Sequence, residues 1–178
     1  KARRLQHIPP LRGPNPSGRP GDNVPRFNNV DLIYDFPLID RKVDLAVVSD
    51  RGLDKLRIYL IDEDALEKGK KPLREVTAFN QPWIFSSSQD EVNEKRTAYG
   101  LATARPFEKG PSFVFVSRND TTTVAKLILY ASPEGTVSYK KIREINLPYR
   151  FSLPEGKSWT PCMDNDGERP HIEGMEIG

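Results

Sequence analysis

Two arginines are the side chains in this sequence whose type and spacing point most directly to chemistry. Arg51 follows the run VDLAVVSD, and Arg118 follows the similar run FVFVS. A guanidinium group suits an oxyanion with several oxygens, because its planar fork of N–H donors matches a phosphate or a carboxylate. The alternative is that each arginine caps a turn or pairs with a neighbouring acid such as Asp50, Asp54 or Asp120.

Tyr99 and Glu173 are further candidates, and each is followed by a glycine. The phenol of Tyr99 could hydrogen-bond a ligand, although an aromatic side chain beside a strand glycine also packs in cores. Glu173 offers carboxylate oxygens of the kind that Ca²⁺ prefers, or it is a solvated acid at a strand end. The acidic run over residues 164–168 lacks the spacing of an EF-hand loop, so we expect a polar turn there.

Catalysis through a protein nucleophile is disfavoured. The histidines are His7 and His171, and neither follows an arginine as in the phosphohistidine phosphatases. Glu168, not an arginine, stands six residues after Cys162, so the cysteine phosphatase loop is absent. The sequence also lacks a Walker loop, an HExxH motif and a G-x-S-x-G motif.

The bulk composition limits the possible partners. The 178 residues include 27 Lys and Arg against 25 Asp and Glu, a net charge of +2 that is small for a nucleic-acid-binding domain. No apolar run is long enough to span a membrane, so we expect neither nucleic acid nor membrane as a partner. The single cysteine excludes an intrachain disulfide. The chain begins without Met or an apolar leader, so we expect a piece of a larger protein.

Alternating apolar residues predict strands in most of the chain. Residues 27–51 predict two short antiparallel strands joined by a connection at 39–41. Val43, Leu45 and Val47 alternate with Asp44, Ala46 and Val48, which indicates a strand with one face better buried than the other. A third strand is predicted at 55–62, and residues 62–71 are mildly helical. Three strands in succession make a β-meander.

The meander occurs twice, which indicates radial or linear repetition of an all-β unit. In the alignment of the two copies, Ser49 matches Ser117, Arg51 matches Arg118 and Tyr59 matches Tyr130, with a longer loop in the second copy. The sequence therefore divides into a possible strand with a Pro/Gly-rich loop, a four-strand unit, a long loop packed by Trp83, Ile84 and Phe85, a second four-strand unit, an inserted loop and the start of a further unit, at residues 1–26, 27–79, 80–97, 98–147, 148–170 and 171–178.

Topology brings the candidate residues to one edge. In an up-and-down meander, the start of the first strand and the end of the second strand lie at the same edge of the sheet. If the units surround a common axis, one face of the molecule gathers strand starts and strand ends, at Asn28, Asn29, Tyr99 and Glu173 and at Arg51 and Arg118.

These motifs resemble the β-propeller phytases, calcium-dependent enzymes that remove phosphate from myo-inositol hexakisphosphate (phytate). The resemblance covers residues 5–178 and rests on FNNVDLIYDFPL, VDLAVVSDR, LRIYLID, the Tyr99–Gly100 start and IEGM, which occur in the family's order and near its spacing. It implies an all-β fold that is part of a six-bladed β-propeller built from four-stranded antiparallel meander blades, with the site on the top face.

The resemblance also implies roles for single residues. Arg51 and Tyr99 correspond to residues that contact substrate phosphate, and Tyr99 is the catalytic candidate. Arg118 stands where the family commonly has a lysine with the same role, and Glu173 stands on an acidic calcium ligand. The implied protein is a secreted or periplasmic phosphoric monoester hydrolase of the 3-phytase type, monomeric at full length, in which several Ca²⁺ ions assist the attack of water.

The sequence departs from the family pattern at several points. Ile33 takes a place where the family has arginine, and the early D-D-P-A-I-W stretch and the later acidic ligands are absent. We therefore predict that this segment alone is inactive. Two alternatives stay open: a propeller scaffold that binds phosphorylated ligands or a protein partner without catalysis, and a propeller hydrolase of lactones or phosphotriesters whose calcium site Asn28, Asn29 and Glu173 could imitate.

Overall fold

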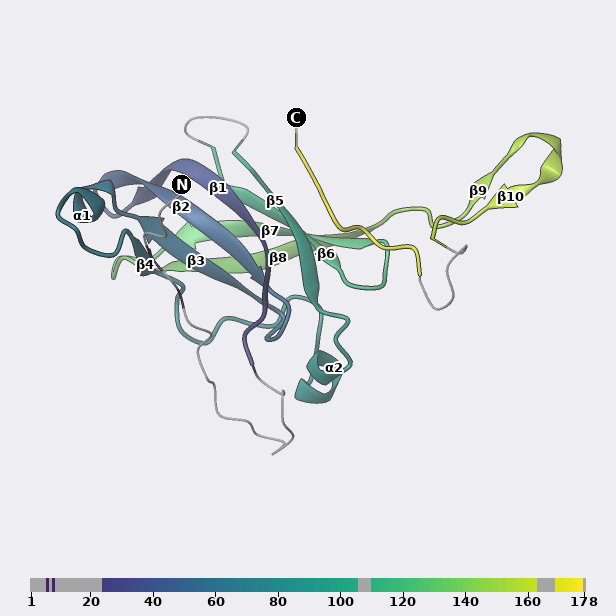
Figure 1. Ribbon diagram of the computed structural model, residues 1–178, viewed down its shortest axis with the longest axis horizontal. Coiled ribbons are helices and arrows are strands. Elements are labelled where there is room, and N and C mark those ends of the chain that lie inside the picture. The colour runs from purple at the N-terminus through teal and green to yellow at the C-terminus, as the bar shows by residue number, and fades with distance from the viewer. Residues whose placement is uncertain (1–5, 7, 9–23, 106–109, 163–168, 178) are drawn as a thin grey trace.

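Two four-stranded antiparallel sheets form the body of the protein (Figure 1). The structure is a computed structural model that describes residues 6, 8, 24–105, 110–162 and 169–177. The first sheet contains β1 (Phe27–Leu38), β2 (Arg41–Asp50), β3 (Lys55–Ile61) and β4 (Leu73–Glu75), and the second contains β5 (Ala98–Ala104), β6 (Phe113–Arg118), β7 (Thr123–Ala131) and β8 (Val137–Asn146). The all-β class and the four-stranded meanders are confirmed, and the six-bladed ring stays a prediction.

The two sheets pack against each other over a shared hydrophobic core. Leu45 and Val47 of β2 and Val114 and Leu127 of the second sheet have no exposed surface and belong to one cluster. Their alternation along each strand is the period of two that the sequence shows, since successive strand side chains point to opposite faces. At the outer edge the N–H of Val137 donates to the carbonyl of Val76 at 2.7 Å, which joins the sheets by backbone as well.

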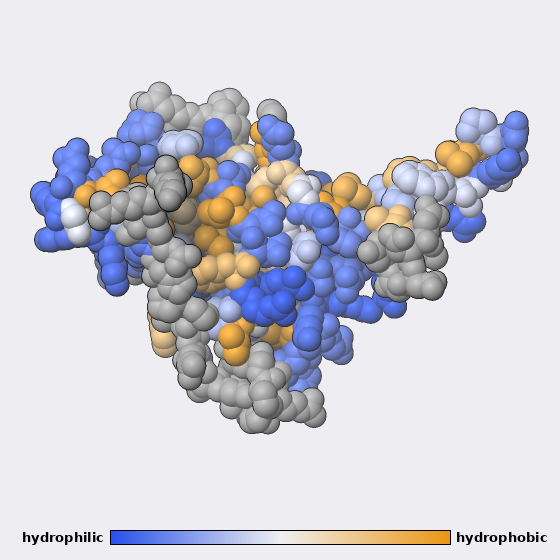
Figure 2. All heavy atoms as spheres, viewed as in Figure 1, coloured by the Kyte–Doolittle hydropathy of each residue, from blue (hydrophilic) through white to orange (hydrophobic). Residues whose placement is uncertain are grey.

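The other face of the first sheet carries a smaller apolar cluster of Ala46, Val48 and Tyr59, with Ile8 packed against it. Figure 2 shows hydrophobic atoms over β2 and β3 within a largely hydrophilic surface. Gln6 extends this contact, because its side-chain amide exchanges two hydrogen bonds with the backbone of Leu73 at 2.9 and 3.1 Å. Most of the predicted segment 1–26 lies outside the described residues.

Each sheet begins with a β-bulge, and a serine fills it. The ladder shifts between Phe27 and Val30 in β1 and between Ala98 and Leu101 in β5. The N–H groups freed from the ladder there donate to serine hydroxyls instead, from Asn29 to Ser49 at 3.1 Å and from Gly100 to Ser117 at 2.8 Å. Bulges re-aim side chains next to functional sites, and these two lie at Asn28–Asn29 and Tyr99–Gly100.

Ser49 and Ser117 also join each sheet to the segment that follows it. The hydroxyl of Ser49 donates to the carbonyl of Tyr99 at 2.6 Å, and the hydroxyl of Ser117 donates to the carbonyl of Ile172 at 2.6 Å. The match of these two serines in the internal repeat is therefore confirmed by equivalent hydrogen bonds.

The other matches in the expected repeat are wrong. Arg118 pairs with the first residue of β5, as Asp50 pairs with the first residue of β1, so Arg118 is the counterpart of Asp50. The N–H of Arg51 donates to Arg26 as that of Asn119 donates to Thr97, which makes Asn119 the counterpart of Arg51. The register likewise matches Tyr59 with Leu127 instead of Tyr130, because Tyr59 pairs with Ala46 as Leu127 pairs with Val114. Aligning like residue types introduced a longer second loop that the ladders do not contain.

The long loop between the sheets is packed, as predicted, and it contains a short helix that was not predicted. Ile84 is buried, and Phe85 packs against the core. Helix α2 (Gln89–Asn93) begins at Ser88, whose hydroxyl accepts from the N–H of Glu91. The Asp54 carboxylate holds the loop in place by accepting from the N–H groups of Phe85 and Ser86 at 2.8 and 2.7 Å.

The remaining elements are peripheral. Helix α1 (Glu63–Glu67) confirms the helical tendency of residues 62–71 and is capped by Asp62. A hairpin of β9 (Phe151–Ser152) and β10 (Ser158–Trp159), closed by a 3₁₀ turn at Pro154–Gly156, extends from the body as an arm (Figure 1). Residues 169–177 are in no assigned strand. No helix among the described residues has the length and apolar composition needed to cross a membrane.

Candidate functional site

Arg51 and Tyr99 lie in direct contact at the end of β2 and the bulge of β5. The Arg51 guanidinium carbon is 4.9 Å from the centre of the Tyr99 ring, which is a cation–π geometry. The backbone of Arg51 is also tied to the second sheet, because the Thr97 hydroxyl donates to its carbonyl at 2.5 Å. Contacts with the second sheet therefore hold both the backbone and the guanidinium of Arg51, and the guanidinium has no hydrogen-bond partner among the described residues.

His171 also contacts Tyr99, and the sequence reasoning missed it as a site residue. Its ring packs edge-on against that of Tyr99, with centres 6.1 Å apart. Its Nδ1 is 2.8 Å from the Arg169 carbonyl, and its Nε2 is 3.0 Å from a Glu173 carboxylate oxygen. Because both partners are acceptors, the arrangement suits an imidazolium with two N–H donors. The pKa of His171 is accordingly raised, first by the Arg169 carbonyl and then by Glu173.

The two asparagines of β1 complete the contacts at this edge. The side-chain amide of Asn28 donates to the carbonyl of Tyr99 at 3.2 Å, and that of Asn29 donates to the carbonyl of Glu173 at 3.4 Å. The structure thus brings Asn28, Asn29, Arg51, Tyr99 and Glu173 to one edge, in line with the topological argument from the sequence.

Arg118 occupies a separate position. Its Nε donates to the carbonyl of Arg96 at 2.9 Å, and its guanidinium lies 5.8 Å from the centre of the Phe85 ring. These contacts turn it toward the loop between the sheets. Its side chain would have to leave the Arg96 carbonyl before it could join Arg51 at a shared ligand.

Neither arginine forms an ion pair with an acid in the part of the chain that the structure describes, although the charge of Arg118 is one of the smaller causes that lower the pKa of Glu91. Asp50 accepts from the N–H groups of Arg26 and Gly52 at 2.9 and 3.1 Å and thereby fixes the turn after β2. Asp54 binds the loop N–H groups and also that of Ala98, at 2.9 Å. Burial raises the pKa of both carboxyls, and these hydrogen bonds oppose the rise. The alternative in which Asp50 or Asp54 pairs with Arg51 therefore has no contact to support it.

Glu173 is available as a metal ligand but is not part of a complete calcium site. Its side chain is 70% exposed, and Ca²⁺ takes 6–8 oxygen ligands. Within residues 24–105, 110–162 and 169–177, no group of three His, Cys, Asp or Glu side chains is close enough to hold a metal ion. The described residues therefore supply one carboxylate and do not by themselves fit a calcium cluster. The acidic run at 164–168 and His7 lie outside the described residues.

The glycine of the β5 bulge allows the terminal segment to approach the site. A Cβ on Gly100 would lie 2.3 Å from the carbonyl oxygen of Glu173 and 2.8 Å from the hydroxyl of Ser117. Both distances are shorter than real Cβ contacts, so only glycine permits this packing. Gly100 therefore allows the backbone of Glu173 to lie next to Tyr99.

The edge combines a guanidinium, a phenol, an imidazole and a carboxylate. The cationic and phenolic groups are donors for the oxygens of an anion such as a phosphate monoester. None of these four groups is a serine or cysteine nucleophile. The thiol of Cys162 is free, but it is exposed on the connection after the arm. The arrangement suits binding and charge stabilisation of a phosphate more than covalent catalysis.

Comparison with known proteins agrees with this chemistry. The family model described as Phytase matches residues 18–153. A curated relative, the 3-phytase of Bacillus subtilis (strain 168), is 34% identical over 124 residues, which cover 68% of this chain and 29% of that protein. The chain thus spans less than a third of the length of this relative. With a family match over most of its residues, the chain belongs to the phytase family.

Proposed function

We propose that the complete protein releases phosphate from myo-inositol hexakisphosphate, as a phosphoric monoester hydrolase of the 3-phytase type. Family membership and the 34% identical 3-phytase support this activity. The structural observation that carries the proposal is the contact of Arg51 with Tyr99, on an edge shared with Glu173. The fold proposed for the complete protein is the six-bladed propeller, and its proposed location is outside the cytoplasm.

Arg51 would hold two oxygens of one phosphate through its planar fork of donors, and Tyr99 would orient the same group through its phenol. Arg118 would add a second guanidinium after release from the Arg96 carbonyl. These donors stabilise the negative charge of the transferred group most strongly where it is greatest, in the transition state. Glu173 would be one calcium ligand, and the other ligands would come from the rest of the complete protein; calcium bound there would supply positive charge for phosphate oxygens and for the activation of water.

The test is phosphate release from myo-inositol hexakisphosphate, with and without Ca²⁺, by the full-length protein and by its Arg51→Ala variant. Loss of Arg51 should reduce kcat/KM by about 100-fold, the effect typical of a lost donor to transition-state charge. Arg143→Ala is the matched control, because Arg143 is exposed on β8. The 178-residue chain alone should release little phosphate. Full activity of Arg51→Ala would contradict the assigned site, and release by the short chain at the full-length rate would contradict its predicted inactivity.

The second candidate is a scaffold that binds phosphorylated ligands without hydrolysing them. It is favoured by the lack of a three-ligand metal group among the described residues and by the position of Arg118 on a backbone carbonyl. A folded full-length protein that binds the hexakisphosphate with Ca²⁺ present and releases no phosphate would establish this function instead.

A further inference from the structure

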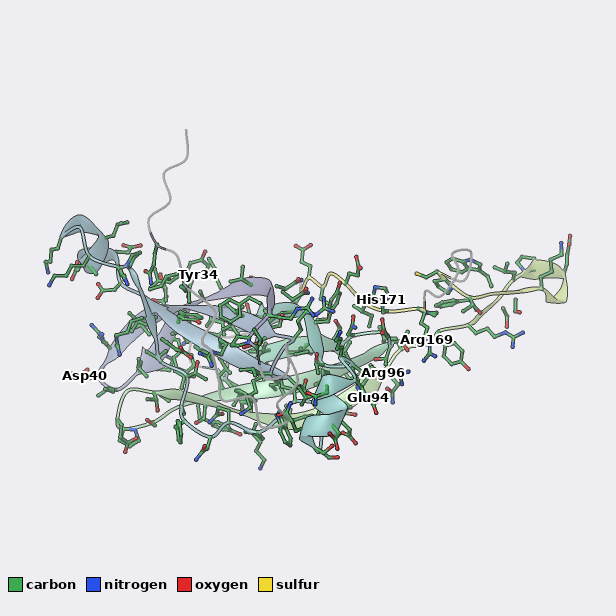
Figure 3. All side chains as sticks on the ribbon, turned by 60° about the horizontal axis from the view of Figure 1, so that its bottom comes forward. Tyr34, Asp40, Glu94, Arg96, Arg169 and His171 are labelled. Carbon is green, nitrogen blue, oxygen red and sulfur yellow. The ribbon has the colours of Figure 1, made fainter. Side chains whose placement is uncertain are left out.

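One side chain of the candidate site contacts Tyr99 but has no free atom with which to bind a ligand. In Figure 3, Arg169 and His171 lie on the terminal segment between the sheets and the arm. The Nδ1 of His171 is 2.8 Å from the Arg169 carbonyl, and its Nε2 is 3.0 Å from a Glu173 carboxylate oxygen. Both ring nitrogens are therefore engaged by protein acceptors, and neither is left for an anion.

The two hydrogen bonds hold the imidazole in one orientation. They engage both nitrogens of the ring, so the ring cannot turn without breaking at least one of them. The side chain of His171 is 19% exposed. The imidazole packs edge-on against the ring of Tyr99, with centres 6.1 Å apart and an angle of 83° between the ring planes. Edge-to-face pairs of rings with centres within about 7 Å attract each other, so a fixed imidazole also fixes its neighbour.

The backbone of Tyr99 is held independently of its ring. Its carbonyl accepts from the Ser49 hydroxyl at 2.6 Å and from the side-chain amide of Asn28 at 3.2 Å. These bonds leave the side-chain torsions free, so the position of the phenol depends on what the ring contacts. The ring contacts the guanidinium of Arg51 and the imidazole of His171. Because Arg51 would bind the substrate phosphate, only the contact with His171 is independent of the ligand.

The terminal segment is held in place by contacts that do not use the imidazole. The carbonyl of Ile172 accepts from the hydroxyl of Ser117 at 2.6 Å. The carbonyl of Glu173 accepts from the side-chain amide of Asn29 at 3.4 Å. Both are backbone contacts of the segment, so they remain possible when the side chain of His171 is replaced. The distinct contribution of the imidazole is therefore its contact with Tyr99.

We propose that His171 is a positioning residue, whose anchored imidazole holds the ring of Tyr99 so that the phenol reaches a phosphate bound by Arg51. The inference rests on the proposed function and deepens it. A side chain that orients a donor without touching the substrate affects the geometry of the reacting complex more than the binding of the substrate. Loss of the imidazole should therefore lower kcat and leave KM nearly unchanged.

The test separates the ring of His171 from its hydrogen bonds, in the full-length protein acting on myo-inositol hexakisphosphate with Ca²⁺. His171→Phe keeps an aromatic ring and loses the hydrogen bonds, whereas His171→Gln keeps hydrogen-bonding atoms and loses the ring. We expect kcat to fall about tenfold in His171→Gln, which corresponds to about 1.4 kcal/mol and is near the upper end for an aromatic pair. In His171→Phe it should fall less than about threefold, because the ring contact is kept.

Phe151→Ala is the matched control. It also removes a ring that pairs with another aromatic side chain, because Phe151 and Trp159 lie on the arm with ring centres 5.8 Å apart. It should leave kcat and KM unchanged, since this pair does not contact Tyr99. Circular dichroism establishes that each variant is folded.

Two further measurements show whether His171 acts through Tyr99. In a Tyr99→Phe background, which has no phenol to position, His171→Gln should lower kcat no further. The second measurement is fluorine NMR of protein labelled with fluorotyrosine, with the Tyr99 resonance assigned by Tyr99→Phe. The chemical shift of this resonance should differ from that of free fluorotyrosine in the parent and in His171→Phe, and it should move toward the free value in His171→Gln.

Equal kcat in the parent and His171→Gln, an equal loss in Phe151→Ala, or additive effects of Tyr99→Phe and His171→Gln would overturn the positioning role. So would a larger loss in His171→Phe than in His171→Gln, because the hydrogen bonds and not the ring would then matter. These outcomes are separate from the proposed function. Phosphate release that is the same in the parent and His171→Gln removes only the positioning role. A full-length protein that releases no phosphate removes the hydrolase, and the fluorine resonance still tests the contact with Tyr99.

Discussion

Removing the hydroxyl of Ser49 or Ser117 should weaken the connection between successive sheets by an amount that their hydrogen bonds predict. Each side chain is fully buried, and each hydroxyl accepts one N–H and donates to one carbonyl of the next segment. Replacement by alanine leaves both partners without a bond, at about 1–3 kcal/mol for each buried group and less where water can reach it. We expect a cost of about 2 kcal/mol for Ser49→Ala, because the Asn29 N–H is only partly buried. For Ser117→Ala we expect about 3 kcal/mol, because the Gly100 N–H is buried.

The assay is urea unfolding followed by the fluorescence of Trp83 and Trp159, analysed by linear extrapolation. Ser138→Ala is the control, since Ser138 lies on β8, away from both bulges. It should change the free energy of unfolding by no more than about 0.5 kcal/mol. If Ser49→Ala and Ser117→Ala match this control, the serines do not hold the bulges, and the account of how Tyr99 is positioned fails with them.

Two further predictions concern the approach of the terminal segment to β5. Gly100→Ala would place a methyl group 2.3 Å from the Glu173 carbonyl oxygen, so we expect it to separate the segment from β5. The ring contact between His171 and Tyr99 should then disappear from nuclear Overhauser spectra, and its persistence would show that the segment adapts. Because the folded-state pKa of His171 is raised, its contribution to stability is complete below the ordinary pKa of 6.5 and is lost as pH rises through the raised value. An NMR titration of the imidazole should show this raised pKa, and Glu173→Gln should lower it; an unchanged pKa in that variant would remove Glu173 as a cause.

Most strands were predictable because apolar side chains recur along them with a period of two. Leu45 and Val47 have no exposed surface, although Ala46 and Val48 on the other face of β2 are also buried, with 8% and 9% of their surface exposed. The first strand was predicted to be short, yet β1 has 12 residues. Two register shifts interrupt its pattern, and a bulge adds a residue without changing composition, so a period of two does not reveal it.

Helix α2 was missed although its start has a sequence signal. Ser88 and Glu91 have the spacing of a capping box, but a helix of five residues is too short to show an apolar period. Such a helix exists because its cap and the burial of Val92 hold it, and the burial of Val92 depends on tertiary packing.

The candidate site was predictable in part, because strand direction places Arg51 and Tyr99 at one edge. Glu173 lies at the same edge, although the strand expected to start there is not assigned. The position of Arg118 was not predictable in this way, since an offset of one residue in a strand turns the side chain to the other face. His171 was examined only for a phosphatase motif. Its spacing of two from Glu173 was a usable signal, because alternate residues of an extended segment lie on the same side.

Ser49 and Ser117 also bear on how such a protein could grow and assemble. Each sheet carries, in its second strand, a hydroxyl that binds a backbone carbonyl of a later segment, which is the start of β5 for Ser49 and the terminal segment for Ser117. A tandem duplication of one unit would produce a neighbour that already fits, without any new contact having to arise. During synthesis, the first sheet could fold and expose the Ser49 hydroxyl before β5 leaves the ribosome. The sheets would then assemble in the order of the chain.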